Sequence, residues 1–197
     1  SCRSSFAPKM SVTGIILAGG LSSRMGNDKG VIQLDQQKMV EKVISILSPI
    51  VDRIIVSANN SNYEQFKFSV IKDKYGRIGP LGGIISGLEE RTTDHNLILS
   101  CDTPRINTSS LNSLLKFSNE FEVVVPYHHG HFEPLAAYYN KGSLDYLIGQ
   151  MKAGEYKLHN ILKGLDFKAV TFPESDETLK EFFNINSKSD LIKYHDY

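Results

Sequence analysis

Long apolar runs are missing from this 197-residue sequence. No stretch approaches the roughly 20 apolar residues that a membrane-spanning helix needs. The first nine residues, SCRSSFAPK, also lack the apolar segment of a secretory signal. We therefore expect a cytoplasmic protein without a membrane segment. Residues 1–9 are expected to be an artificial remnant or a disordered leader, and residues 10–197, which start at Met10, to form one folded domain.

Cysteine and net charge are scarce as well. Cys101 is the one cysteine after Met10, which excludes an internal disulfide and a thiolate metal site in that part and is typical of a reducing compartment. Burial at the end of a strand explains Cys101 better than a role as a nucleophile. The 22 basic and 22 acidic side chains give a net charge of +0, which argues against a non-specific nucleic-acid binder.

Apolar runs alternate with helical patterns along the chain. The predicted strands span residues 12–18, 53–57, 68–71, 96–100, 122–126 and 134–139, and the predicted helices span residues 39–47, 81–90, 108–118 and 141–151. This alternation predicts an α/β fold, a single domain with three layers, α/β/α, around a Rossmann-like and mostly parallel sheet. In such sheets, ligands bind beyond the carboxyl ends of the strands.

The most informative segment is LAGGLSSRMGNDK, residues 17–29, directly after the first predicted strand. Its glycines let the backbone approach a ligand closely, and successive N–H groups in such a turn form an anion site. Arg24 and Lys29 add two positive charges. The spacing fits neither the phosphate loop G-x-x-x-x-G-K-[ST] nor the dinucleotide motif G-x-G-x-x-G. On its residues alone, the segment is either a polyphosphate-binding loop or an ordinary strand-to-helix turn.

A second glycine-containing segment, Gly79-Pro80-Leu81-Gly82-Gly83, begins the second predicted helix. Proline suits the first helical position, whereas each of the two later glycines costs roughly 1 kcal/mol relative to alanine. Either a ligand approaches the backbone here or the helix packs tightly against the sheet. On the first interpretation, the backbone of this segment forms the surface that a nucleoside base or ribose contacts.

Two aspartates end predicted strands on the same edge of the sheet. Asp102 follows strand 96–100, where a carboxylate is costly unless it is paired or binds a cation. Asp102 is therefore the best candidate ligand for Mg²⁺, with an Asx-turn or a helix cap as the alternative. Asp73 ends strand 68–71, and a solvated charge is the simplest interpretation of it.

Three of the six histidines lie in the segment YHHGHFEPL, residues 127–135. Zinc needs three or four ligands in tetrahedral geometry, and the adjacent His128 and His129 do not supply that arrangement. We expect instead a loop before a strand, lying over a second substrate.

Four motifs, in this order, resemble those of the molybdenum cofactor guanylyltransferases, a family of α/β nucleotidyltransferases. They are LAGGLSSRMGNDK, the G-P-L-x-G element at residues 79–83, the C-D-T-P element at residues 101–104, and the F-x-N-x-N element that contains Asn184 and Asn186. The resemblance covers most of residues 10–191. It implies the fold of the nucleotide-diphospho-sugar transferases and a nucleotidyltransferase domain over residues 10–197.

The resemblance implies transfer of GMP from GTP to the phosphate of molybdopterin, with release of pyrophosphate and with Mg²⁺ held by Asp102. The implied catalytic residues are Lys29, Arg24 and Asp102. The implied nucleotide-binding residues are Leu17, Ala18, Gly19, Gly20, Lys29, Asp73, Gly79, Pro80, Leu81 and Asp102. Asn184 and Asn186 are expected to contact the acceptor. Proteins that deliver molybdopterin or receive the product are further implied partners.

Two departures from the family pattern and two rival functions stay open on sequence alone. Ser57 stands where some members carry an asparagine near the base, and Glu133 stands where members often carry a histidine or a basic residue. A molybdopterin cytidylyltransferase, or another small-molecule nucleotidyltransferase, would share most of these motifs. A non-catalytic nucleotide-binding module is the rival from a different class.

Overall fold

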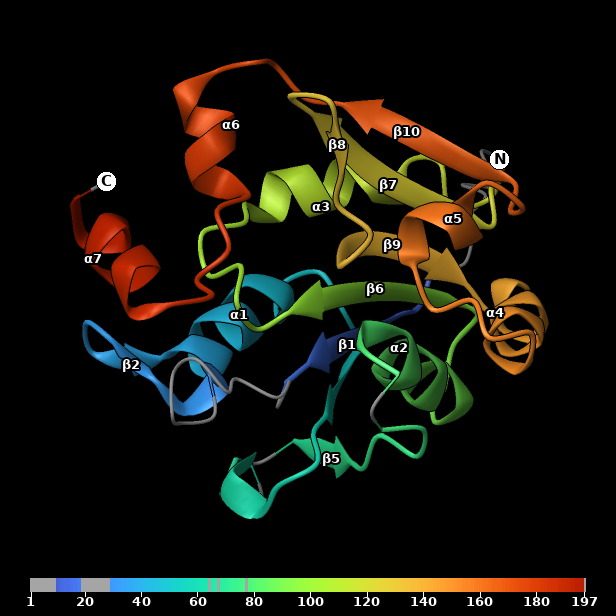
Figure 1. Cartoon of the computed structure of the whole chain (residues 1–197), viewed down its shortest axis with the longest axis horizontal. Helices are drawn as coiled ribbons and strands as arrows, with labels where there is room; N and C mark the ends of the chain where they lie inside the picture. Colours follow the sequence, from blue (N-terminus) through green and yellow to red (C-terminus); the bar gives the residue numbers. More distant parts are fainter. Residues whose placement is uncertain (1–9, 19–28, 64, 67, 77, 197) are drawn as a thin grey trace, which may run out of the picture.

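The computed structural model describes residues 10–18, 29–63, 65–66, 68–76 and 78–196 (Figure 1). In this part of the chain, one large sheet has the strand order β10-β7-β9-β6-β1-β4-β5, with β8 paired to β7. The strands are β1 Val12–Leu17, β4 Arg53–Ser57, β5 Ser69–Ile71, β6 His95–Ser100, β7 Val123–His128, β8 His131–Phe132, β9 Ala136–Asn140 and β10 Phe167–Thr171. The predicted mostly parallel α/β sheet is confirmed.

Strand β9 runs against its two neighbours. It pairs antiparallel with both β6 and β7, whereas the pairs β1–β4, β1–β6, β4–β5 and β7–β10 are parallel. The reversal begins at the hairpin between β7 and β8. There His129 and Gly130 have φ values of 45° and 80°, the positive values that a tight two-residue turn requires. The chain therefore turns back through β8 into β9 without a crossover helix.

Helices cover both faces of the sheet (Figure 1). They are α1 Met39–Leu47, α2 Pro80–Glu89, α3 Thr108–Leu115, α4 Ser143–Lys152, α5 Leu158–Leu162, α6 Asp176–Glu181 and α7 Lys188–Asp196. Adjacent strand residues point to opposite faces, so Ile16 packs into the core with α1 and α3, while Ile15 packs with α2, α4 and α5. This alternation of two apolar faces produces the predicted three layers.

A short hairpin and the C-terminal helix complete the described chain. The hairpin pairs β2 Gln33–Leu34 with β3 Gln37–Lys38, and the turn η1 Lys29–Val31 directly precedes it. The turn η2 Ser61–Tyr63 follows β4. A small buried cluster of Leu34, Met39, Ile185 and Tyr194 joins this hairpin to α7. Among the helices that the structure describes, none combines the length and the apolar character that a bilayer crossing requires.

The predicted helices and strands are present, with shifted ends. Strand β9 begins at Ala136 rather than at Pro134, because proline cannot donate a ladder hydrogen bond. Helix α3 ends at Leu115, and the chain continues in a tighter turn in which the Ser118 N–H donates to the Leu115 carbonyl at 3.2 Å. Helix α7 begins directly after Ser187, whose hydroxyl accepts the Asp190 N–H at 3.2 Å. The elements α5, α6, β8 and β10 were not predicted from the sequence.

Candidate active site

The carboxyl ends of β1, β4 and β6 are joined by backbone hydrogen bonds that continue past the strands. The Ala18 N–H donates to the Ser57 carbonyl at 2.9 Å, and the Cys101 N–H donates to the Leu17 carbonyl at 3.0 Å. Leu17 and Ala18 therefore reach the sheet edge in a fixed position, where the predicted phosphate loop starts. Cys101 is buried, as its place at the strand end predicted.

The predicted phosphate loop ends at the turn η1, which Lys29 begins. Three other predicted members of this loop lie outside the described residues: Gly19, Gly20 and Arg24. Gly30 shows what holds η1 in place, because a Cβ there would lie 2.1 Å from the Tyr63 hydroxyl oxygen and 2.9 Å from two of its ring carbons. Tyr63 is fully buried, so the backbone of η1 packs directly on its ring. Sequence reasoning missed Gly30 as a positioning residue.

Helix α2 begins beside this edge, and its glycines serve different purposes. Gly79, at the N-cap, has a φ of 74°, which favours glycine, and a Cβ there would meet nothing within 4 Å. A Cβ on Gly82 would lie 2.8 Å from Oδ1 of Asp73, and one on Gly83 would lie 3.1 Å from Cδ2 of Leu17. Tight packing therefore explains Gly82 and Gly83. Gly79 is exposed, and its open surroundings leave the predicted role in nucleotide binding available to it.

Asp73 is half-buried and belongs to a network between β5, α2 and the loop after β4. Its Oδ1 accepts hydrogen bonds from the Tyr75 N–H at 2.9 Å and from the Ser86 hydroxyl at 3.5 Å. Its own N–H donates to Oδ1 of Asn59 at 3.1 Å. The carboxylate of Asp73 is therefore hydrogen-bonded within the protein as well as partly exposed, and its predicted role in nucleotide binding stays a prediction. The network fixes a carboxylate next to the first turn of α2, where Pro80 occupies the first helical position and Leu81 is buried.

Asp102 lies where β6 meets the C-terminal segment. Its carbonyl accepts the Ile185 N–H at 2.8 Å, and the hydroxyl of the neighbouring Thr103 donates to Oδ1 of Asn184 at 2.8 Å. Side-chain oxygen Oδ1 of Asp102 is shielded from solvent. The structure thus brings Asn184, and with it the exposed Asn186, to the same sheet edge as Asp102.

A second carboxyl group, that of Glu133, lies close to Asp102. In the β6–β9 ladder Leu99 pairs with Ala136, and the Ser100 N–H donates to the Leu135 carbonyl at 2.8 Å. Glu133 comes just before the turn that leads into β9, in which the Ala136 N–H donates to the Glu133 carbonyl at 3.1 Å. Burial raises the pKa of Glu133 to about 7, and the negative charge of Asp102 is the second cause. Sequence reasoning treated Glu133 as a departure from the family, because the pairing of β9 with β6, which brings the two carboxyl groups to the same edge, is not visible in the sequence.

The buried imidazole of His128 supports Glu133 from the β7 side. Its Nε2 lies 3.2 Å from Oε1 of Glu133, and its ring stacks on Phe182 with centroids 4.6 Å apart. Burial is the largest cause that lowers the pKa of His128, and the neighbouring His129 and His131 lower it further. The segment predicted as a loop before a strand forms the β7–β8 hairpin, and its position over a second substrate stays a prediction.

This edge suits a hard divalent cation better than zinc. Magnesium takes one or two protein carboxylates and completes its shell with substrate phosphates and water. Asp102, with the Glu133 carboxyl group beside it, matches that requirement. Across the residues that the structure describes, no three His, Cys, Asp or Glu side chains are arranged to hold a metal ion by themselves. A cation here would therefore be bound together with a phosphate-bearing substrate.

Comparison with known proteins decides the family. Residues 14–170 match the family model of the MobA-like NTP transferase domain. The chain belongs to this family. A molybdenum cofactor guanylyltransferase of Vibrio parahaemolyticus is 35% identical to this MobA-like chain over 185 residues, which cover 91% of the chain and 93% of the relative. A probable molybdenum cofactor guanylyltransferase of Natranaerobius thermophilus is 32% identical over 198 residues, covering 94% and 96%.

A solved structure agrees with the fold. Molybdopterin-guanine dinucleotide biosynthesis protein A from Archaeoglobus fulgidus matches this MobA-like chain with a TM-score of 0.79 at 24% identity, covering 93% of this chain and 97% of that one. The fold is that of the nucleotide-diphospho-sugar transferases. The chain is a nucleotidyltransferase, and enzymes of this kind typically use a divalent metal.

Proposed function

We propose that this MobA-like protein transfers GMP from GTP to the phosphate of molybdopterin and releases pyrophosphate. The observation that carries the proposal is the 35% identity to a relative named molybdenum cofactor guanylyltransferase over nearly the whole of both chains. The convergence of Asp102, Glu133 and Asn184 supports it, because the reaction needs a cation beside the phosphates and polar groups for an acceptor. A cytoplasmic location, and protein partners that deliver molybdopterin or receive the product, belong to the same proposal.

The triphosphate lies against residues 17–29 in this proposal. Backbone N–H groups of Gly19 and Gly20 donate to phosphate oxygens, and Lys29 and Arg24 offset the negative charge. The N–H of Ala18, predicted as a third donor, is already used by the Ser57 carbonyl. The attachment of Ala18 to β4 supports this arrangement, because it starts the loop from a rigid backbone.

The nucleoside lies between the end of β1 and the start of α2. The residues assigned to it are Leu17, Asp73, Gly79, Pro80 and Leu81. The exposed backbone of Gly79 allows a base or ribose to approach without meeting a side chain. The carboxylate of Asp73 is held in place by Tyr75, and it supplies acceptor atoms at this end of the site.

Magnesium, held by Asp102, would offset the negative charge that builds up on the phosphates during transfer. The carboxylate of Asp102 is positioned for this by backbone hydrogen bonds on both sides of it, through Cys101 and through its own carbonyl. Glu133 adds a second oxygen donor near the same point. The protein contributes placement and charge here and forms no covalent bond to the substrate.

The reaction is a single displacement at phosphorus. An oxygen of the acceptor phosphate forms a bond to the α-phosphorus of GTP, and the bond from that phosphorus to the bridging oxygen of pyrophosphate breaks. Asn184 contributes to acceptor positioning, because Thr103 fixes its amide oxygen and the amide N–H groups can then donate to the acceptor. Asn186 is exposed two residues further along and is assigned the same role.

Pyrophosphate release tests the proposal directly. Purified protein is supplied with molybdopterin, Mg²⁺ and GTP, CTP or ATP, and we expect release with GTP to be the fastest. Asp102→Asn should lower turnover by about 100-fold or more, while Asp145→Asn on the exposed side of α4 should leave it unchanged. Faster release with CTP would replace the guanylyl assignment with a cytidylyl one. Tight GTP binding without release would contradict an enzymatic role.

A further inference from the structure

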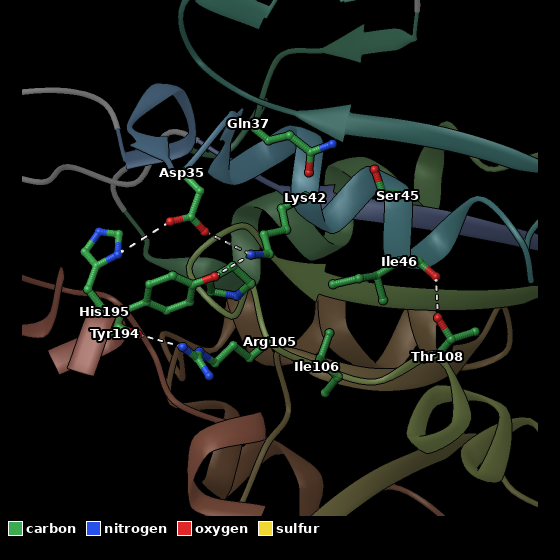
Figure 2. A pocket seen from close by; sticks show the side chains of 11 residues that line it. Asp35, Gln37, Lys42, Ser45, Ile46, Arg105, Ile106, Thr108, Tyr194 and His195 are labelled. Atoms are coloured by element: carbon green, nitrogen blue, oxygen red, sulfur yellow. Dashed lines mark hydrogen bonds and ion pairs between the residues drawn. The ribbon is translucent and has the colours of Figure 1, made fainter. Parts of the chain in front are cut away.

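A polar groove lies on the outer side of the segments that form the active site. Its volume is about 630 Å³, and it lies between the β2–β3 turn, helix α1, the loop after Asp102 and helix α7 (Figure 2). We call it the α1–α7 groove and define it by Asp35, Lys42, Ile46, Arg105, Ile106 and His195. None of these residues belongs to the proposed nucleotide or acceptor site.

The lining of the α1–α7 groove carries excess positive charge. Lys42 and Arg105 are two cations and Asp35 is one carboxylate, so the described lining has a net charge of one positive unit, or two when His195 is protonated. Asp35 lies between its two partners, with Oδ2 at 3.8 Å from Nζ of Lys42 and Oδ1 at 3.6 Å from Nδ1 of His195 (Figure 2). The whole chain has a net charge of +0, so this excess is a local feature.

Arg105 is held in a fixed orientation at the inner end of the groove. Its guanidinium carbon lies 4.3 Å from the ring centroid of Tyr194, and its Nη2 donates to the Tyr194 carbonyl at 2.6 Å. Nε of Arg105 is buried and has no hydrogen-bond partner in the described part of the chain. Tyr194 is itself buried and also accepts a hydrogen bond from Lys42. The two cations are thus already ordered, which lowers the entropy cost of binding a carboxylate.

The size of the groove indicates what kind of anion it takes. At about 30 Å³ per water molecule, its volume corresponds to about 20 waters, far more than one phosphate or carboxylate group occupies. Ile46, which is half-buried, adds an apolar surface beside the cations, whereas Pro104 and Ile106 are buried beneath the lining. An extended acidic peptide with an apolar residue next to its carboxylates matches both features, in the manner of other acidic motifs that arginine clusters recognise.

We propose that the α1–α7 groove binds an acidic peptide segment of a protein partner. One carboxylate of the segment pairs with Arg105 and Lys42, and a neighbouring apolar side chain packs on Ile46. The groove shares the chain segments of Asp102 and of Asn186, since Arg105 follows the first and α7 follows the second. A bound partner would therefore contact the protein next to its active site without entering it.

Fluorescence anisotropy with a labelled peptide, Glu-Leu-Asp-Leu-Glu-Asp, tests the proposal. We expect saturable binding that weakens with added salt, and binding of the neutral peptide Gln-Leu-Asn-Leu-Gln-Asn at least tenfold weaker. Arg105→Gln should weaken binding by about tenfold or more, because a charged hydrogen-bonding partner is removed from a buried position. Lys116→Gln, an exposed change on the C-terminal side of α3, is the matched control and should leave binding unchanged.

Asp35→Asn keeps the test decisive even where Arg105→Gln unfolds α7. Asp35 has a φ of 53°, a conformation that asparagine also adopts, so the variant removes one negative charge and keeps the turn. It should strengthen binding of the acidic peptide by about threefold, a gain that misfolding does not produce. Equal binding of the acidic and neutral peptides, or an unchanged affinity in Asp35→Asn, would overturn the proposal. So would displacement of the peptide by inorganic pyrophosphate at equal concentration, which would assign the groove to a small anion.

Discussion

Gly30 offers the sharpest test of how the protein positions Lys29. In Gly30→Ala, the new Cβ would lie 2.1 Å from the Tyr63 hydroxyl oxygen, far inside normal contact distance, and the fully buried Tyr63 cannot turn away. The turn η1 must therefore move or stay strained, at a cost of about 1–3 kcal/mol in the free energy of unfolding. In a chain of this size, each kcal/mol lowers the melting temperature by about 2–4 °C.

Displacement of η1 also displaces Lys29, which begins it. A shift of about 1 Å in a positioning group costs on the order of 100-fold in rate, so we expect kcat/KM for GTP to fall by about 10- to 100-fold. Steady-state pyrophosphate release measures this fall, and urea unfolding measures the stability change in the same preparation. Tyr63→Phe in the Gly30→Ala background removes the closest contact and should recover part of both losses.

Gly164→Ala is a matched control for Gly30→Ala. A Cβ on Gly164 would lie 1.9 Å from the Tyr146 hydroxyl oxygen, but Tyr146 is half-buried and Gly164 follows α5, away from the sheet edge of the site. We expect a smaller loss of stability and unchanged kcat/KM. A Gly30→Ala protein that loses stability but keeps its kcat/KM would refute the link between this packing contact and Lys29. Unchanged stability would refute the packing argument itself.

Three further substitutions test separate parts of the site. Asp73→Asn keeps an oxygen that accepts the Tyr75 N–H, so the fold should persist while calorimetry shows about tenfold weaker GTP binding; unchanged binding would remove Asp73 from the nucleotide site. Thr103→Val removes the hydroxyl that fixes Asn184, and KM for molybdopterin should rise about three- to tenfold while KM for GTP stays constant. Burial raises the pKa of Glu133 from 4.5 to about 7, so the folded protein holds more protons than the unfolded chain between these pH values. Stability of the metal-free protein should therefore fall as pH rises from about 4.5 to about 7, and urea titrations of Glu133→Gln should show a flatter profile.

The central helices and strands can be predicted from the sequence, because their apolar patterns involve residues that are close together in the chain. The buried residues Val40, Val43 and Leu47 recur at helical spacing, and α1 has the predicted bounds. Strand β10, in contrast, is an edge strand with partly buried side chains, so neither alternation nor a continuous apolar run marks Phe167–Thr171. The short helices α5 and α6 are missed for a similar reason, because one or two turns carry too few periodic positions.

In the candidate site, too, some residues can be predicted from local sequence patterns and others depend on contacts between distant segments. Asp102 is predicted because a carboxylate after a buried strand is unusual by itself. Glu133 is not, since its relation to Asp102 depends on the register between β6 and the antiparallel β9, which no local pattern gives. Gly30 requires knowledge of Tyr63, a residue of another turn. For Gly82 and Gly83 the sequence left ligand approach and tight packing open, and the close positions of Asp73 and Leu17 favour packing.

At Asp102, the backbone takes part in the fold, whereas the side-chain carboxylate is the group proposed to bind the cation. Backbone hydrogen bonds hold this part of the chain, from Cys101 to Leu17, from Ser100 to Leu135 and from Ile185 to the Asp102 carbonyl. These bonds form without the carboxylate, so Asp102→Asn should keep them and, with them, the junction of β1, β6, β9 and the C-terminal segment. Its melting temperature should stay within a few degrees of the parent protein, because asparagine keeps the size of this partly buried side chain and a change of about 1 kcal/mol is expected. A large loss of stability would mean that the carboxylate holds the fold together, and its assignment to a cation would then lose its main support.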